Sequence, residues 1–123
     1  MSLIGGWRVQ EVLRPSMANE LRRAPRYSLT SVAEITDLRT GTRITAQTSD
    51  VSLVGCYVDT LNPLPAGTQV KITITHENEV FVSAGVVAYS TASMGMGIKF
   101  LKVQHDYLGV LRNWVSKFNR SES

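Results

Sequence analysis

The sequence has few of the residues on which metal and disulfide chemistry depends. Its 123 residues include one cysteine, Cys56, and two histidines, His76 and His105. A single cysteine cannot form an internal disulfide, which agrees with a reducing compartment. Neither histidine belongs to a motif with metal-ligand spacing, so we expect both on the surface and predict no metal site.

Long apolar runs and targeting signals are lacking as well. No stretch approaches the roughly 18 apolar residues of a membrane-spanning helix, and residues 1–7 show no basic region followed by an apolar one. We therefore predict a cytoplasmic protein without membrane insertion. With 43% hydrophobic and 19% charged residues, the composition is that of a single globular domain.

No catalytic pattern is evident, so we predict that the protein is not an enzyme and uses no cofactor. The carboxylates are scattered along the chain without an obvious pair. Gly95-Met96-Gly97 lies within a predicted strand and lacks the third glycine of a phosphate-binding fingerprint. Cys56 has strand-like neighbours, which favours a small buried hydrophobic side chain over a nucleophile.

The distribution of apolar residues is typical of a small β-protein. Alternation of apolar and polar residues begins at Tyr27 and recurs in short segments up to Leu101, with turn residues between them. In the last segment, Gly95 and Gly97 occupy alternate positions where side chains would be excluded. Five or six short strands, followed by an amphipathic helix over residues 105–118, predict a small antiparallel barrel with an attached helix.

Residues 1–26 carry the whole formal excess of positive charge. Five arginines and two glutamates give this segment +3, which equals the net charge of the chain. Arg22, Arg23 and Arg26 form its densest cluster, and a short basic cluster ahead of a neutral domain suggests an anion site. A solvated surface cluster is the alternative. Pro15 interrupts any long helix in the segment but is compatible with a short one.

Two motifs occur in order around the first predicted strands. Arg22-x-x-x-Arg26 precedes the first strand, and Asp50-x-Ser52-x-x-Gly55 lies between the second and the third. Together they resemble the signature of the PilZ domain, a family of six-stranded β-barrels that act as receptors for the bacterial second messenger cyclic di-GMP. Either motif alone is weak, whereas both in order within a strand pattern are specific.

The resemblance implies a division of the chain. Residues 1–20 form an N-terminal extension, residues 21–118 the PilZ domain and residues 119–123 a tail. Within the domain we expect the barrel at about 27–101 and the helix at about 105–118. The predicted fold is therefore mainly all-β: a small six-stranded antiparallel PilZ-type barrel with a C-terminal amphipathic helix and an N-terminal basic linker.

The resemblance also implies a site for cyclic di-GMP. Arg22 and Arg26 would clasp its phosphates and guanine edges, because a guanidinium group can bond bidentately to either. Arg23 is an additional candidate contact. Asp50 would accept hydrogen bonds from the guanine N1–H and amine, and Ser52 would bond a nearby base or phosphate.

The glycines of the two motif regions have different expected functions. Gly55 would complete the wall that faces the arginines, since it permits a close backbone approach or a positive φ. Gly97 is expected to support the packing of the barrel. A simpler interpretation of Asp50, Ser52 and Gly55 is that they are turn residues that satisfy the backbone, and the sequence leaves this open.

These motifs predict a cyclic di-GMP receptor or adaptor whose arginine linker changes conformation on binding and signals to a downstream protein partner. The alternative is a PilZ-like interaction module in motility or exopolysaccharide export that binds no ligand. We predict no nucleic-acid polymer as partner, because the basic excess is confined to one segment without an aromatic stacking run. Apolar residues of the N-terminal segment or the last helix leave a homodimer open.

Overall fold

The computed structural model describes residues 27–122, with side chains up to residue 117. The N-terminal extension and the predicted site residues Arg22, Arg23 and Arg26 lie outside the described residues. This part of the chain forms six strands and one helix: β1 (Tyr27–Asp37), β2 (Arg43–Val51), β3 (Gly55–Asp59), β4 (Gln69–His76), β5 (Glu79–Thr91), β6 (Gly95–Leu101) and α2 (His105–Glu122).

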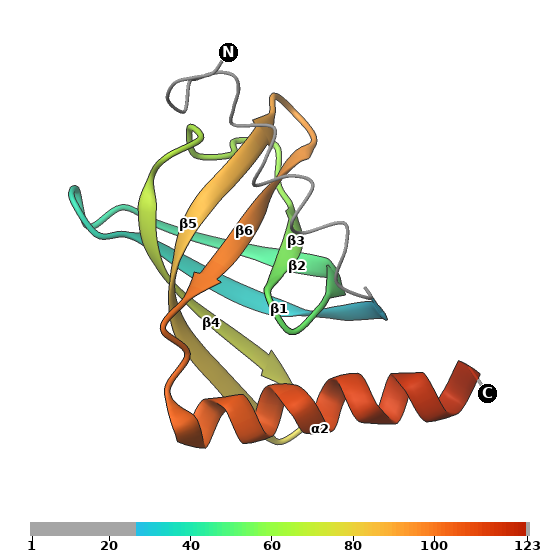
Figure 1. Ribbon diagram of the computed structural model, residues 1–123. Coiled ribbons are helices and arrows are strands. Elements are labelled where there is room, and N and C mark those ends of the chain that lie inside the picture. The colour runs from blue at the N-terminus through green and yellow to red at the C-terminus, as the bar shows by residue number, and fades with distance from the viewer. Residues whose placement is uncertain (1–26, 123) are drawn as a thin grey trace, which may run out of the picture.

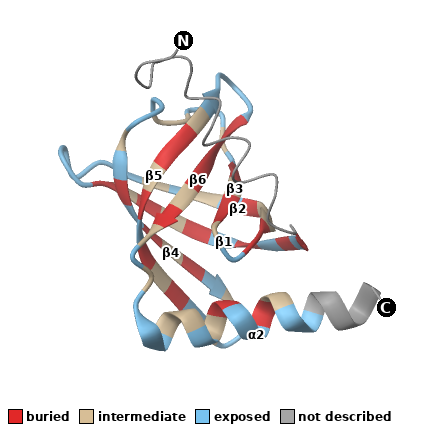
Figure 2. Ribbon diagram, in the orientation of Figure 1, coloured by how far each residue is buried: buried red, intermediate tan, exposed pale blue. Residues whose placement is uncertain are grey.

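The six strands close into one barrel in the order β1-β2-β3-β6-β5-β4 (Figure 1). All six neighbouring pairs are antiparallel. Every second residue of β1 is buried, as Figure 2 shows by the alternating colours along the strands, because successive side chains of a strand point to opposite faces. The structure thus confirms the predicted six-stranded antiparallel barrel followed by a C-terminal helix.

Aliphatic and aromatic side chains fill the barrel. Ile35, Ile72 and Ile98 are completely buried, as is Phe81, whose ring centroid lies 4.9 Å from that of Phe100. Burying a side chain of this size contributes about 1.5–3 kcal/mol. The core therefore combines residues of all six strands with Leu111 and Trp114 of α2.

Helix α2 crosses one end of the barrel and packs on β5 and β1 (Figure 1). Its apolar face includes Leu111 and Trp114, which are buried. The Trp114 indole Nε1–H also donates a hydrogen bond to Glu79 Oε1 at 2.8 Å. The helix ends at Glu122, so residues 119–122, which the sequence assigned to a tail, are helical.

The position of His76 differs from the expected surface location. It ends β4, where its side chain is 25% exposed and its Nδ1 shares a 2.7 Å hydrogen bond with Ser31 Oγ. Its ring also meets Trp114 edge-on, with centroids 5.7 Å apart. The turn at this position was evident from the sequence, but the helix that covers it was not. His105 is exposed, as predicted.

Cys56 is buried in the core, as predicted. Burial raises the pKa of its thiol, and the nearby charge of Asp50 adds to this effect. The thiol therefore stays protonated at neutral pH and packs as a small hydrophobic group.

Candidate functional site

The second motif forms the turn that joins β2 to β3, and Ser52 holds it together. The Ser52 backbone N–H donates to Gly55 O at 2.8 Å, and its Oγ accepts from the backbone N–H groups of Val54 and Gly55 at 3.1 and 3.2 Å. The hydroxyl also donates to Gly55 O at 3.3 Å. Ser52 is 1% exposed, so its hydrogen-bonding capacity is used within the turn. The structure favours the turn interpretation for this residue.

A bulge sets the direction of Asp50. Thr48 pairs with Val58, and the next paired residue, Asp50, faces Tyr57, so β2 contains one residue more than β3 at this point. Thr48 is completely buried and points into the barrel, and strict alternation would send Asp50 inward too. The extra residue, Ser49, shifts the inward and outward alternation of β2 by one residue, so that Asp50 lies on the outer face.

The Thr48 hydroxyl stabilises a matching irregularity in β1. It donates to Leu29 O at 2.5 Å and accepts from the Ser31 backbone N–H at 3.2 Å. The register of β1 against β2 shifts between Ser28 and Ser31, where these groups would otherwise lose ladder partners. One buried side chain therefore satisfies the backbone on both sides of the shift.

The strand register places Asp50 in a row of outward-facing residues. Asp50 pairs with Ser28 on one side and with Tyr57 on the other. The row continues from Tyr57 to Gly97 and from Gly97 to Tyr89. It crosses five strands of the barrel and joins a carboxylate to two aromatic rings.

The two tyrosines of this row lie against the glycines of β6. A Cβ atom on Gly97 would come within 2.4 Å of the Tyr89 ring, and one on Gly95 within 2.8 Å of the Tyr57 ring. The two rings are tilted by 31°, with centroids 6.2 Å apart. Burial raises the pKa of Tyr57, and the charges of Tyr89, Asp59 and Asp50 add to this shift, so its hydroxyl remains a donor at neutral pH.

Sequence reasoning did not assign these tyrosines to the site. The available signal was the Gly-x-Gly pattern of β6, which indicates that something lies close to the strand. The pattern does not identify the neighbouring residues, because the register that brings Tyr57 and Tyr89 onto the glycines depends on pairing between strands that are distant in sequence.

The first motif ends where the barrel begins. Tyr27, the residue that follows Arg26, pairs with Val51, and Ser28 pairs with Asp50. The chain therefore enters the barrel directly beside the second motif. Among the described glycines, positive φ angles occur at Gly41 and Gly67, so Gly55 does not use this freedom.

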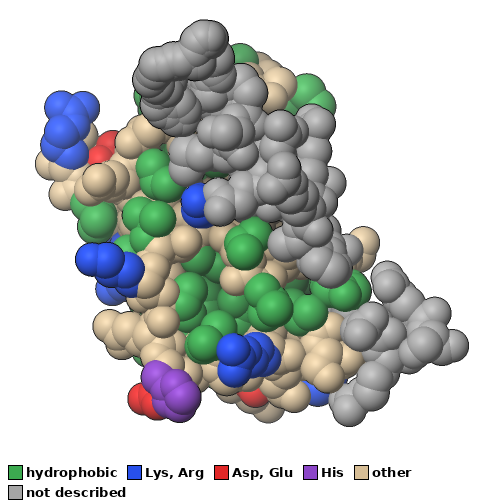
Figure 3. Space-filling model, in the orientation of Figure 1, with side chains coloured by type: hydrophobic (Ala, Val, Ile, Leu, Met, Phe, Trp, Pro, Cys, Tyr) green, Lys and Arg blue, Asp and Glu red, His purple; other side chains and the backbone are tan. Residues whose placement is uncertain are grey.

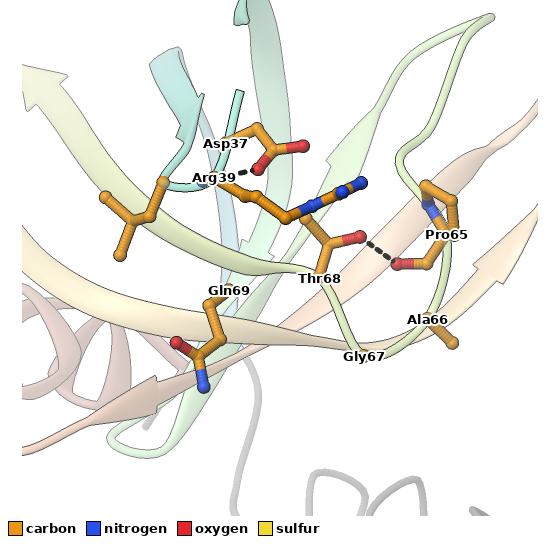
Figure 4. A pocket seen from close by; sticks show the side chains of 8 residues that line it. Asp37, Arg39, Pro65, Ala66, Gly67, Thr68 and Gln69 are labelled. Atoms are coloured by element: carbon orange, nitrogen blue, oxygen red, sulfur yellow. Dashed lines mark hydrogen bonds between the residues drawn. The ribbon is translucent and has the colours of Figure 1, made fainter. Parts of the chain in front are cut away.

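A hollow of about 590 Å³ lies at the far end of β1, between Asp37 and the loop that contains Pro65 and Thr68. Figure 4 shows the Arg39 side chain extending across it. Asp37 Oδ1 accepts a hydrogen bond from the Arg39 backbone N–H at 2.9 Å, which lowers the pKa of this carboxyl, and Thr68 Oγ1 donates to Pro65 O at 2.7 Å. These polar groups stabilise two turns, so we assign no ligand to the hollow.

The described part of the chain contains neither a candidate metal site nor a candidate membrane-spanning helix. Between residues 27 and 122 no group of three or more His, Cys, Asp or Glu side chains is placed to hold a metal ion. In the same range no helix is both long enough and apolar enough to cross a membrane.

The comparisons with known proteins agree with this fold. The model of the PilZ domain family matches residues 20–117. The PilZ domain of YcgR from Escherichia coli, solved with c-di-GMP, has a TM-score of 0.65 at 18% identity, over 82% of this chain and 93% of that one. The PilZ domain of CeSA from a cellulose-synthesizing bacterium has a TM-score of 0.61 at 17% identity, over 78% of this chain and 99% of that one.

A third similar structure is the Bacillus subtilis inhibitor of motility, MotI/DgrA. Its TM-score is 0.67 at 12% identity, over 81% of this chain and 52% of that one, so this chain spans about half of its length. No curated protein matches the sequence. At these identities the solved structures show the fold alone, whereas the family model matches most of the chain. The chain therefore belongs to the PilZ domain family, whose domains are non-catalytic receptors for cyclic di-GMP.

Proposed function

We propose that this protein is a cyclic di-GMP receptor that binds its ligand on the outer face of the barrel, where β1 begins beside the turn between β2 and β3. The observation that carries this proposal is the pairing of Ser28 with Asp50. Arg26 lies two residues before Ser28 in the sequence, which supports the proposal that the two motifs act on one ligand.

The residues of the two motifs complement the ligand chemically. Cyclic di-GMP has two phosphates, and Arg22, Arg23 and Arg26 supply three positive charges that can bind them or the guanine O6 and N7 atoms. Asp50, an acceptor on the outer face, matches the guanine N1–H and amine. The neighbouring rings of Tyr57 and Tyr89, tilted by 31° to each other, each offer an aromatic face on which a base can stack.

Ser52 and Gly55 support binding through the turn. Their hydrogen bonds fix the path of the chain from Asp50 to β3. We therefore expect Ser52→Ala to lower the thermal stability of the protein and, through the position of Asp50, its affinity. Restored affinity without restored stability in Ser52→Thr would argue for a direct contact instead.

Ligand binding is expected to reorient the segment that precedes Tyr27. Three nearby arginines repel one another, and a doubly charged ligand removes this repulsion when the segment folds over it. A ligand shifts such an equilibrium only by its difference in affinity for the two arrangements, so the arginines must contact it in one and not in the other. Protection of Arg22, Arg23 and Arg26 from trypsin by saturating ligand would support this output, and unchanged cleavage would refute it.

Titration calorimetry with cyclic di-GMP tests the proposal. Wild-type protein should bind saturably, and the double variant Arg22→Ala, Arg26→Ala should bind at least about a hundredfold more weakly, because each lost charged contact is worth well over 1 kcal/mol. Asp50→Ala should also weaken binding. Arg39→Ala, which removes an arginine at the far end of β1, is the matched control and should bind as wild type does.

Circular dichroism establishes that each variant is folded. Absence of binding by folded wild-type protein would refute the receptor proposal and direct attention to an interaction module without ligand. Equal binding of GMP and cyclic di-GMP would refute recognition of the cyclic dinucleotide.

A further inference from the structure

A groove of about 570 Å³ is lined by residues of β4, β5 and the end of β6. In the closed strand order, the seam between β2 and β3 carries the second motif, and the seam between β4 and β5 lies across the ring from it. Lys71 of β4 pairs with Ala84 of β5, which pairs with Leu101 of β6. These three residues line the groove together with Val82.

The remaining wall comes from the connection between β6 and α2 and from the first turn of α2. Lys102, Gln104 and Tyr107 line the groove from this side. The backbone at Lys102 is left-handed, with φ of 50°, which turns the chain away from β6. On the face of the molecule that Figure 3 shows, hydrophobic side chains gather in front of β6 and above α2, and basic side chains lie around them.

Among the described residues, the lining of the groove combines apolar side chains with basic groups and no acidic ones. Leu38, at one end, is 56% exposed, which is high for so large a hydrophobic side chain. The charged side chains that line the groove are Lys71 and Lys102, both exposed. Within the described residues neither lysine forms an ion pair. A complementary partner therefore presents apolar groups next to carboxylates.

We propose that this groove docks a short segment of a partner protein in which apolar side chains are flanked by Asp or Glu. The barrel is closed, so it offers no free strand edge and such a segment must be recognised through its side chains. The groove is concave and has room for a few apolar side chains of a partner. A flat bilayer would instead be contacted by side chains that protrude from the protein surface. Two lysines would add only about 1 kcal/mol each toward an anionic bilayer.

The lining of the groove includes none of the described motif residues Asp50, Ser52 and Gly55. A segment docked between β4, β5 and α2 leaves the outer face at Asp50 open, so the protein can hold ligand and partner together. The groove proposal does not rest on cyclic di-GMP binding. The two proposals fail separately, because the groove variants below retain both motifs.

A selection from a random library of 12-residue peptides tests the groove. Immobilised wild-type protein selects binders, and the Ala84→Arg variant, which fills the groove with a bulky cation, removes peptides that bind elsewhere. We expect the recovered peptides to be rich in acidic and apolar residues. Fluorescence anisotropy then measures each peptide against Ala84→Arg and against Lys71→Glu, Lys102→Glu, both of which should bind about tenfold more weakly or worse.

Matched variants control for charge and bulk elsewhere on the surface. Arg112→Glu, Lys117→Glu reverses two charges on exposed positions of α2, and Thr45→Arg adds an arginine to the outer face of β2. Both should bind the peptides as wild type does. All groove variants should retain the melting temperature of wild type and its titration with cyclic di-GMP.

Several outcomes would overturn the proposal. One is the recovery of no peptide, of basic peptides, or of peptides that bind Ala84→Arg equally well. Another is flotation with phosphatidylglycerol vesicles that the groove variants lose, which would assign the groove to membrane lipid. A third is self-association in sedimentation equilibrium that Ala84→Arg abolishes, which would assign it to a second copy of the chain.

Discussion

Replacing Gly97 by alanine tests whether Tyr89 is held flat against β6. The new Cβ atom would lie 2.4 Å from two ring carbons of Tyr89, whereas carbon atoms pack at about 3.5–4.0 Å, so the ring must move by about 1 Å or more. Overpacking of this kind costs about 1–3 kcal/mol, and removing a strand glycine returns about 0.5–1 kcal/mol. We expect Gly97→Ala to lower the free energy of unfolding by about 1–2 kcal/mol.

The same substitution in a Tyr89→Ala background isolates the contact. With the ring removed, Gly97→Ala should be neutral or stabilise the protein by about 0.5 kcal/mol, which gives a coupling energy of about 2 kcal/mol. Urea unfolding of the four proteins, followed by circular dichroism, measures this cycle. An equal cost of Gly97→Ala in both backgrounds would refute the packing of the tyrosine on the glycine.

Three further predictions concern single residues. Thr48→Val keeps the shape of the side chain but removes the partner of Leu29 O and of the Ser31 N–H, so urea unfolding should show a loss of about 2 kcal/mol, and a loss below 0.5 kcal/mol would contradict the bridging bonds. Cys56→Ala should flatten the alkaline stability profile. Because the pKa of the thiol is higher in the folded than in the unfolded protein, its contribution to the free energy of unfolding is complete below the ordinary pKa of 9.0 and is lost as pH rises. The free energy of unfolding of wild type should therefore fall by about 1.4 kcal/mol more than that of the variant between about pH 8 and pH 10. If urea unfolding gives the same pH dependence for both proteins, the burial of Cys56 is contradicted. Gly109→Ala adds a Cβ with no atom within 4 Å in the middle of α2, so it should raise the unfolding free energy by about 1 kcal/mol, and a lower melting temperature would mean that this face of the helix is covered.

The fold was predictable because most of its determinants are local. Alternation in β1 and β4 follows directly from the sequence, since each strand buries one side chain in two. The helix was likewise evident from the spacing of Leu111 and Trp114, which lie on its buried face. Its end was not, because nothing between residues 118 and 122 breaks a helix in the way that proline or glycine would.

The geometry of the site depended on information that alternation does not contain. The sequence identified Asp50 and Ser52 through a motif, but periodicity in β2 would have placed Asp50 inside the barrel. The two residues also have different surroundings in the structure, because the Ser52 hydroxyl is buried in the turn while Asp50 faces outward. The half-buried state of His76 was unpredictable for a similar reason, since its contacts come from Ser31 and Trp114, far away in sequence.

The irregularity at Thr48 explains how the end of β2 contributes both to the buried core and to the outward-facing candidate site. Thr48 and Val51 are three residues apart and both fully buried, whereas residues three apart in a regular strand face opposite sides, and Asp50 between them faces outward. The extra residue changes the phase within a single strand and so separates the core positions from the site positions. Because Thr48 binds the backbone of β1 as well, the change is shared by the strand that follows the arginine motif. Ser49 thus turns Asp50 outward, while the hydroxyl of the adjacent Thr48 holds the backbone of β1 where the described chain enters the barrel.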